Sequence, residues 1–179
     1  MIIGLVGYAG SGKDEVAKFL VEKHGFERRA FADKIRDMLY EMNPMIGTEP
    51  LQIFVDVNGW DEAKRHPEVR RLLQKLGVSV RNHLSPSAWI NPVVRSINPG
   101  DRIVITDVRF LNEVEMIRKG FENSEIWRVE RPGVGPVNNH ISESELANYN
   151  ADRVLVNGGT LDELGLLVQT RIGSLLHAN

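Results

Sequence analysis

A glycine-rich segment near the N-terminus constrains the fold of this chain more than any other feature. Residues 7–13 read Gly-Tyr-Ala-Gly-Ser-Gly-Lys, which matches the phosphate-loop pattern G-x-x-x-x-G-K. An apolar run at residues 2–6 precedes it, as expected for a strand buried on both faces of a parallel sheet. Residues 13–23 follow with apolar side chains at helical spacing. This context indicates a nucleotide-binding loop rather than a strand-to-helix turn with an accidental lysine.

Each part of the loop has a role in phosphate binding. Glycines let backbone N–H groups turn toward phosphate oxygens, and the helix N-terminus adds partial positive charge. Asp14 stands where Ser or Thr normally ligates Mg²⁺; a carboxylate can hold the ion directly or through water, although an acid also suits the first turn of a helix. We expect the ATP-binding residues here to be Gly7, Ala9, Gly10, Ser11, Gly12, Lys13 and Asp14, with Lys13 reaching the β- and γ-phosphates.

Strands alternate with helices along the rest of the chain, which predicts an α/β fold with a mostly parallel sheet. Further strands are expected at residues 26–31, 103–105, 126–129 and 154–156. Helices are expected at 32–43, 61–76 (ending at Gly77), 87–97, 110–119, 142–149 (with a capping box of Ser142 and Glu145) and 161–176. Residues 44–60 and 131–141 are expected to be irregular.

Composition excludes several classes of protein. A length of 179 residues favours one domain, spanning 1–179. The absence of cysteine excludes disulfides and thiolate sites, and a formal net charge of −2 argues against a nucleic-acid polymer as partner. No apolar run approaches the ~20 residues needed to cross a bilayer, and the N-terminus lacks the basic region of a signal peptide. We expect a cytoplasmic protein that binds small molecules and not membranes.

An ordered series of motifs resembles the phage-type deoxynucleoside monophosphate kinases. The motifs are Gly-x-x-Gly-Ser-Gly-Lys-Asp at 7–14, Phe31-Ala32-Asp33, Leu73-Gln74-Lys75-Leu76-Gly77 with Arg81 and Trp89, Asp107-Val108-Arg109-Phe110-x-Asn112-Glu113, Arg131-Pro132, His140-x-Ser142-Glu143 and Asn157-x-Gly159-Thr160-Leu161. The resemblance implies a P-loop NTPase fold, with a five-stranded parallel sheet flanked by helices. It also implies an acceptor-binding region at about 33–98, a short lid at about 131–141, and a possible homodimer.

Phosphoryl transfer requires positioning and positive charge more than a strong base, so carboxylates for Mg²⁺ and arginines are the residues of interest. Asp107 follows the strand at 103–105, where open α/β sheets carry their ligands. It is expected to bind Mg²⁺ through water or to hold Arg109; the alternative is an N-cap for the helix at 110–119. Arg109 is expected to contact phosphate, or otherwise to pair with Glu113.

The remaining candidate residues belong to the acceptor region, the lid and the last strand. Arg131 is expected to stack on adenine or to reach the phosphates, and His140 is a possible lid contact. The backbone at Asn157 and Gly159 is expected to hold the adenine edge, unless it is a plain turn. The acceptor-binding candidates are Asp33, Arg36, Arg70, Gln74 (reading a base edge), Arg81 (clamping the acceptor phosphate) and Trp89, which either stacks on the base or belongs to the core.

Three functions are compatible with these motifs. The leading one is transfer of the ATP γ-phosphoryl group to a deoxynucleoside monophosphate, giving ADP and the diphosphate. A kinase similar to phosphomevalonate or dephospho-coenzyme A kinase is the second, and Gln74 with Trp89 favours a planar base over such acceptors. A nucleotide-binding regulator without turnover is the third. Asp107, Arg109 and Arg131 argue against it, because binding alone needs no clamp for transition-state charge.

The loop assignment predicts that Lys13→Ala removes most turnover, because it deletes the positive charge nearest the bridge between the β- and γ-phosphates. A steady-state assay of ADP release measures the effect. Turnover that stays within a few-fold of the unsubstituted protein would contradict the assignment.

Overall fold

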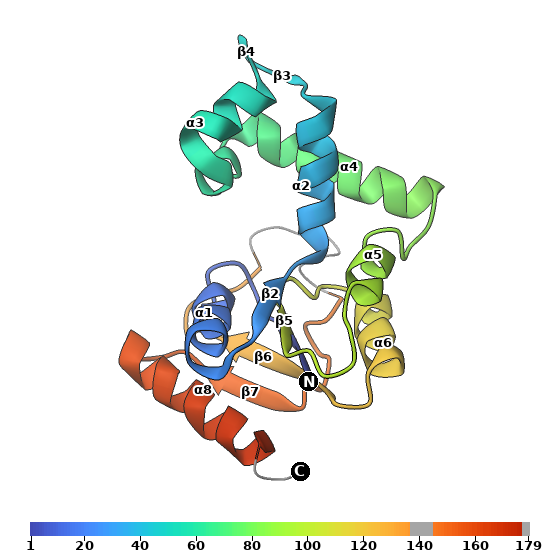
Figure 1. Cartoon of the computed structure of the whole chain (residues 1–179). Helices are drawn as coiled ribbons and strands as arrows, with labels where there is room; N and C mark the ends of the chain where they lie inside the picture. Colours follow the sequence, from blue (N-terminus) through green and yellow to red (C-terminus); the bar gives the residue numbers. More distant parts are fainter. Residues whose placement is uncertain (137–144, 177–179) are drawn as a thin grey trace. The chain divides into compact units, whose positions relative to one another are not determined.

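The chain forms two compact units, Met1–Ala30 with Val94–Asn179 and Phe31–Val93. The computed structural model describes residues 1–136 and 145–176. The first unit contains the sheet and the second is mainly helical, and each is considered by itself (Figure 1).

The first unit is built on a five-stranded sheet in the order β2-β5-β1-β6-β7, in which every strand pair is parallel. All five residues of the central strand β1 are buried, as its unbroken apolar sequence predicts. The strands are β1 (Ile2–Val6), β2 (Glu27–Arg29), β5 (Ile103–Ile105), β6 (Ser124–Glu130) and β7 (Arg153–Val156).

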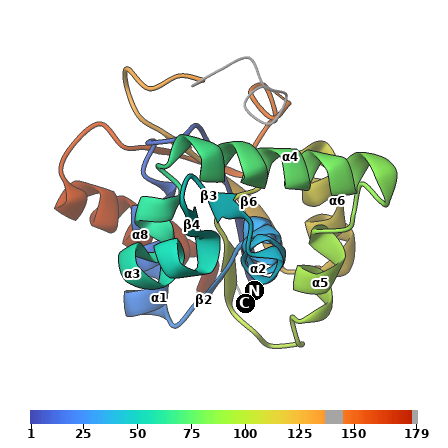
Figure 2. The same ribbon diagram turned by 90° about the horizontal axis from the view of Figure 1, so that it is seen from above.

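Helices cover both faces of this sheet. On one face α1 (Lys13–His24) and α8 (Leu161–Leu176) pack on Ile3 and Leu5 of β1. On the other face α6 (Leu111–Gly120) packs at Gly4, and Figures 1 and 2 show it on the side of the sheet away from α1 and α8. The predicted α/β fold, with a parallel five-stranded sheet flanked by helices, is confirmed.

The second unit surrounds a smaller core. Its helices are α2 (Phe31–Met42), α3 (Leu51–Ala63), α4 (Pro67–His83) and the first part of α5 (Ile90–Arg95), with a hairpin of β3 (Met45–Ile46) and β4 (Glu49–Pro50). Figures 1 and 2 show α2 crossing α4. The buried side chains of this core are Leu39, Ile46, Leu51, Val55, Ala63 and Val69.

The prediction that residues 44–60 are irregular is wrong, because they form the hairpin and α3. Two-residue strands are too short to leave an alternating pattern in the sequence. Gly59, with φ 75° and ψ 163°, interrupts α3, so that the apolar spacing breaks inside the helix. The single helix expected at 61–76 is in fact the end of α3 followed by α4, and the proline that begins α4, Pro67, favours a helix start at that position.

Gly77 does not end α4, contrary to the prediction, and the helix continues to His83. Gly77 is buried, and a Cβ atom there would lie 3.1 Å from Ile35 Cδ1 of α2. Its carbonyl accepts the indole N–H of Trp89 at 3.0 Å. Packing against α2 and Trp89 therefore explains this glycine, and its low helix propensity is overridden.

The short helix expected at 142–149 is not supported where the chain is described. Ser142 lies outside the described residues, and residues 145–148 form turns. The Glu145 carboxylate accepts the backbone N–H of Leu111 at 2.7 Å and so satisfies the first residue of α6.

The packing of α6 on the sheet predicts that Gly4→Val destabilises the protein. A Cβ atom at Gly4 would lie 2.8 Å from Ile126 Cδ1, with Val108 and Ile117 close by. Overpacking of this kind costs about 1–3 kcal/mol, and urea unfolding measures it. The control is Val154→Ala. Because Val154 is 44% exposed, this substitution should change the free energy of unfolding little. Equal stability of the two variants would contradict the prediction, because it would show that α6 can shift to accommodate a side chain at position 4.

Candidate nucleotide-binding site

The loop between β1 and α1 approaches the ends of β6 and β7 so closely that glycine is required. Gly7 has φ 142°, and a Cβ atom there would lie 2.3 Å from the carbonyl oxygen of Val129 in β6. Gly12 has φ 104°, and its Cβ would lie 2.4 Å from Nδ2 of Asn157, which follows β7. At Gly7 a side chain would clash with the backbone of β6, whereas at Gly12 it would displace the Asn157 side chain, and the positive φ at both positions favours glycine.

Lys13 is the first residue of α1, and its ammonium group bends back over the loop. Its Nζ donates to the carbonyl oxygens of Gly7 and Tyr8, each at 2.7 Å. Gly12 is the N-cap of α1, and no side chain among the described residues caps the helix there. The helix N-terminus thus offers backbone donors and partial positive charge beside a lysine, as an anion site requires.

Asn157 supports this loop from behind. Its side chain donates from Nδ2 to the carbonyl of Ser11 at 2.9 Å, and the residue is only 8% exposed. Its backbone N–H donates to the Glu130 carbonyl at 2.7 Å, so that this N–H is not available for the edge of a base. Gly159 follows at the turn into α8, and its expected contact with adenine stays a prediction.

The turn after Gly159 is closed by a capping box at the start of α8. The Glu163 carboxylate accepts the backbone N–H of Thr160 at 2.7 Å and its hydroxyl at 3.1 Å. The Glu163 N–H in turn donates to the Thr160 hydroxyl. The backbone hydrogen bond from Thr160, followed by that from its hydroxyl, lowers the pKa of Glu163.

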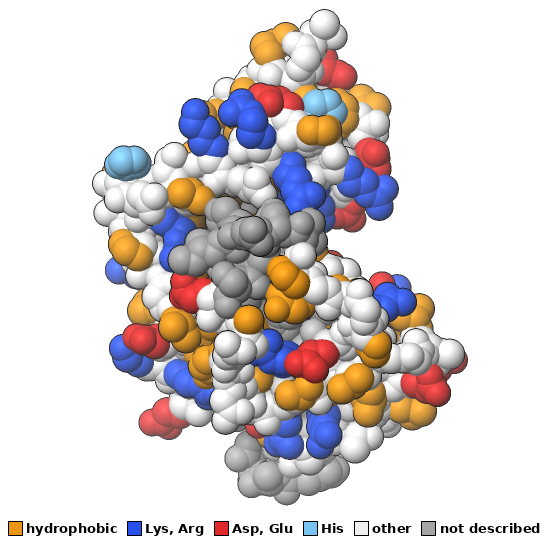
Figure 3. Space-filling view, turned by 180° about the vertical axis from the view of Figure 1, so that it is seen from behind, with side chains coloured by type: hydrophobic (Ala, Val, Ile, Leu, Met, Phe, Trp, Pro, Cys, Tyr) orange, Lys and Arg blue, Asp and Glu red, His pale blue; other side chains and the backbone are white. Residues whose placement is uncertain are grey.

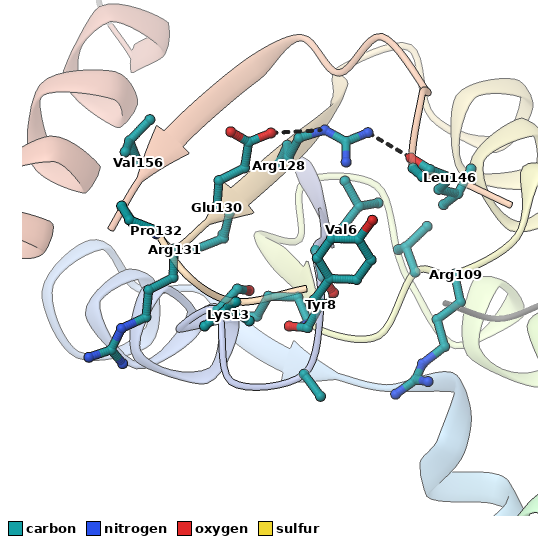
Figure 4. A pocket seen from close by; sticks show the side chains of 17 residues that line it. Val6, Tyr8, Lys13, Arg109, Arg128, Glu130, Arg131, Pro132, Leu146 and Val156 are labelled. Atoms are coloured by element: carbon teal, nitrogen blue, oxygen red, sulfur yellow. Dashed lines mark hydrogen bonds and ion pairs between the residues drawn. The ribbon is translucent and has the colours of Figure 1, made fainter. Parts of the chain in front are cut away.

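A cavity of about 320 Å³ lies against the loop and the end of β6, within the size range of small-molecule sites. Figure 4 shows Arg131 and Arg109 on either side of Tyr8 and Lys13. The structure thus brings three predicted residues with positive side chains, Lys13, Arg109 and Arg131, to one cavity. Among the predicted loop residues, those that line it are Gly7, Ala9, Ser11 and Lys13.

The acidic candidates lie near this cavity without lining it. Val108 donates its N–H to the Leu5 carbonyl at 3.2 Å, which extends the β1–β5 pairing and brings Asp107 level with the start of the loop. The N-cap of α6 is Phe110, so the alternative role of Asp107 as helix cap is wrong. Asp14 is exposed in the first turn of α1.

Glu113 organises the backbone between Asp107 and α6. This residue is 5% exposed, and its carboxylate accepts the N–H groups of Arg109 at 2.7 Å and Phe110 at 3.1 Å. The second contact is the reciprocal half of a capping box. Glu113 therefore holds the backbone from which the Arg109 side chain reaches the cavity.

Arg128 lines the cavity in a way that the sequence did not reveal. Its Nη2 donates to the carbonyls of Leu146 and Tyr149, each at 2.7 Å, and its side chain is 12% exposed. The same segment is held at Asp152, which pairs with Arg118 at 2.8 Å and accepts the Ile126 N–H at 2.6 Å. Arg128 thus secures a wall of the cavity. An arginine inside a buried strand was the one available signal, because such a charge needs partners.

The acceptor-binding candidates all lie in the second unit. Asp33 and Arg36 form an ion pair at 2.9 Å on α2. On α4, Arg70, Gln74 and Arg81 recur at helical spacing and so share one side of the helix. Arg71 points elsewhere, pairing with Glu68 at 2.6 Å where both side chains are exposed.

Trp89 requires a correction. The residue is 6% exposed, and its indole N–H is bonded to Gly77 within the same unit. A base could not stack on a ring buried in this way, so Trp89 belongs to the packing of the second unit. This was the alternative that the sequence had left open.

Comparison with known proteins decides the family. The family model described as deoxynucleotide monophosphate kinase matches residues 53–167. A protein of Acanthamoeba polyphaga mimivirus, provisionally described as a deoxynucleotide monophosphate kinase, is 30% identical over 188 aligned residues, covering 91% of each chain. The chain belongs to the deoxynucleotide monophosphate kinase family. The predicted family and kinase activity are confirmed, and the protein is an ATP-dependent phosphotransferase.

Solved structures similar to this kinase include other kinases at low identity. An APS kinase of Mycobacterium tuberculosis matches with a TM-score of 0.47 at 14% identity, covering 96% of each chain. A gluconokinase of Sinorhizobium meliloti 1021 matches with a TM-score of 0.48 at 12% identity, covering 98% of this chain and 94% of the other. Within the described residues, no helix of the kinase has the length and apolarity to cross a membrane.

Arg81 lies on the same side of α4 as Arg70 and Gln74, the other acceptor-binding candidates of this helix. We therefore expect Arg81→Ala to raise the KM for the nucleoside monophosphate about tenfold, with a much smaller effect on the KM for ATP. Arg81 is expected to clamp the acceptor phosphate, and a charge-assisted hydrogen bond of that kind is worth about 1.5–3 kcal/mol. Initial rates with each substrate varied in turn measure both constants. Arg71→Ala is the matched control and should leave both unchanged. An equal rise of both constants in Arg81→Ala would remove Arg81 from the acceptor site.

Proposed function

We propose that this kinase transfers the γ-phosphoryl group of ATP to the phosphate of a deoxynucleoside monophosphate within the cavity at the glycine loop. The observation that supports the proposal most is that Lys13, Arg109 and Arg131 all line that cavity. Three positive side chains beside a helix N-terminus match the charge of a triphosphate and of a transferring phosphoryl group.

The roles follow from the chemistry of the reacting groups. The acceptor phosphate is largely ionised at neutral pH and is its own nucleophile, so no strong general base is required. Loop N–H groups bind the phosphates of ATP, and Lys13 neutralises charge at its β- and γ-phosphates. Arg109 and Arg131 lie at the cavity to neutralise the charge that spreads over the transferring group.

Mg²⁺ is part of the proposal, and the acidic residues fit it. Among the described residues, no group of three or more His, Asp or Glu side chains could hold a metal ion. Kinases hold Mg²⁺ through one or two carboxylates plus substrate phosphates, and Asp107 and Asp14 suit that arrangement. The ion would neutralise phosphate charge.

The acceptor-binding region is proposed at 33–98, and its candidate residues all lie in the second unit. The Asp33–Arg36 pair presents an oriented guanidinium, and Arg70 and Arg81 flank Gln74 on α4. Since Trp89 is buried, recognition of a planar base depends on Gln74, whose amide can donate to and accept from a base edge. The lid is proposed at 131–141, of which residues 131–136 are described; His140 lies outside the described residues.

Small nucleotides are the proposed partners, in preference to a nucleic-acid polymer. Acidic and basic side chains are interspersed on the face shown in Figure 3, and the formal net charge is −2. A polymer would favour a continuous basic surface. We also propose that the protein is cytoplasmic, because ATP and nucleotides are found there. A homodimer is the proposed assembly.

An assay of ADP release with Mg²⁺ and ATP tests the proposal against a panel of deoxynucleoside and ribonucleoside monophosphates, phosphomevalonate and dephospho-coenzyme A. Turnover with one or more deoxynucleotides supports it and gives the base preference. Turnover only with another acceptor would overturn the assignment of residues 33–98. Tight ATP binding without turnover on any acceptor would favour a regulator.

The proposed metal site predicts that Asp107→Asn raises the Mg²⁺ concentration for half-maximal turnover about tenfold, because the amide carries no charge to hold the ion or its water. A titration of rate against Mg²⁺ at fixed ATP measures this. The control is Glu115→Gln on α6, an exposed partner of Lys119, which should behave as the unsubstituted enzyme. If the Mg²⁺ titration of Asp107→Asn matches that of the unsubstituted enzyme, Asp107 is excluded from the metal site. The variant Asp14→Asn tests Asp14 in the same way.

A further inference from the structure

We propose that Asn157 is a positioning residue that sets the direction of the Gly12 amide and so prepares the loop for ATP. The inference rests on the proposed binding of ATP phosphates at the glycine loop. It assigns the Asn157 side chain a task different from contact with the base, and it depends on three features of the described structure.

The first feature is the hydrogen bond from Asn157 to the loop. A carbonyl oxygen only accepts, so the Asn157 atom facing Ser11 must be the amide nitrogen, which lies 2.9 Å from it. The residue is 8% exposed, and a carbonyl that lost this donor would be left unsatisfied in a buried place. The bond joins positions 146 residues apart and closes the loop against the end of the sheet.

The second feature is the geometry of the peptide between Ser11 and Gly12. The described chain contains no cis peptide bond, so this peptide is trans, and its C=O and N–H groups point in opposite directions. Holding the Ser11 carbonyl against Asn157 therefore turns the Gly12 N–H away from Asn157. Backbone N–H groups of this loop are the donors that bind phosphate.

The third feature is the freedom of Gly12 itself. At φ 104° only glycine is comfortable, and a glycine peptide can rotate at little steric cost. Asn157 opposes that rotation from a fixed place, because its own N–H continues the β6–β7 pairing through a 2.7 Å bond to Glu130. The Cβ of any other residue at position 12 would lie 2.4 Å from the Asn157 amide, so the glycine and the asparagine fit each other.

The test measures ATP binding, with Mg²⁺ present, by calorimetry on folded Asn157→Ala and Asn157→Asp variants. We expect the Kd for ATP to rise about tenfold or more in both, because the Ser11 carbonyl loses its donor and the Gly12 peptide is no longer held. Thr160→Ala is the matched control. It breaks the capping box of the same β7–α8 connection and should lower Tm without changing the Kd.

The Asp variant gives a readout that a merely structural role would not produce. A protonated carboxyl can donate to the Ser11 carbonyl and a carboxylate cannot. The ratio of its Kd to that of the unsubstituted protein should therefore fall between pH 8 and pH 5, while the ratio for Asn157→Ala stays constant. Comparing ratios at each pH removes the titration of ATP itself.

ATP affinities within twofold of the unsubstituted protein in both variants, with a lowered Tm alone, would overturn the proposal. So would equal pH behaviour of the two variants. If neither variant folds, the Gly12 amide of the ¹⁵N-labelled unsubstituted protein decides: its resonance should move strongly on addition of ATP, and a stationary resonance refutes the inference. Because these measurements need no acceptor, ATP binding without turnover on deoxynucleotides would refute the proposed function and leave this inference standing.

Discussion

The close approach of the glycine loop to the ends of β6 and β7 is the constraint on which the rest of the site depends. Gly7 lies against the Val129 carbonyl and Gly12 against the Asn157 side chain, with no space for a Cβ atom at either position. Because the strands are parallel, their carboxyl ends meet at one edge of the sheet, and the residues that follow β1, β5 and β6 converge there. In the proposed function, the backbone N–H groups of the loop bind phosphate, and side chains supply charge around them.

Much of the fold could be predicted because the sheet is buried on both faces. Such strands leave continuous apolar runs, and β1 and β5 were located from them. The second unit was harder, because its signals are local and conflicting. Gly59 breaks the pattern of α3, whereas Gly77 continues α4 because Ile35 packs closely over it. Whether a glycine ends a helix or admits a neighbour depends on contacts that sequence spacing does not contain.

In the candidate site too, residues next to a strand or motif could be predicted from the sequence, whereas contacts between residues far apart in the sequence could not. Lys13, Arg109 and Arg131 were predicted because each follows directly from a strand or from the loop motif, and they line one cavity. Trp89 was ambiguous for a physical reason: an aromatic ring can pack in a core or stack on a base, and its burial together with the bond to the Gly77 carbonyl decides between them. The Asn157–Ser11 bond joins residues 146 positions apart, beyond the reach of any motif.

Arg128 and Arg131 show why residue type alone does not assign a role. The two arginines are close in sequence, one within β6 and the other just after it, and both line the cavity. Arg128 is nearly buried, and its Nη2 donates to the carbonyl oxygens of Leu146 and Tyr149. Its side chain therefore holds the segment that borders the cavity. Arg131 is exposed and begins the loop that leaves the sheet. The buried guanidinium would lose structural bonds by moving toward a phosphate, whereas the exposed one exchanges only water. Burial and partners therefore separate the arginine that supports the site from the arginine suited to act in it.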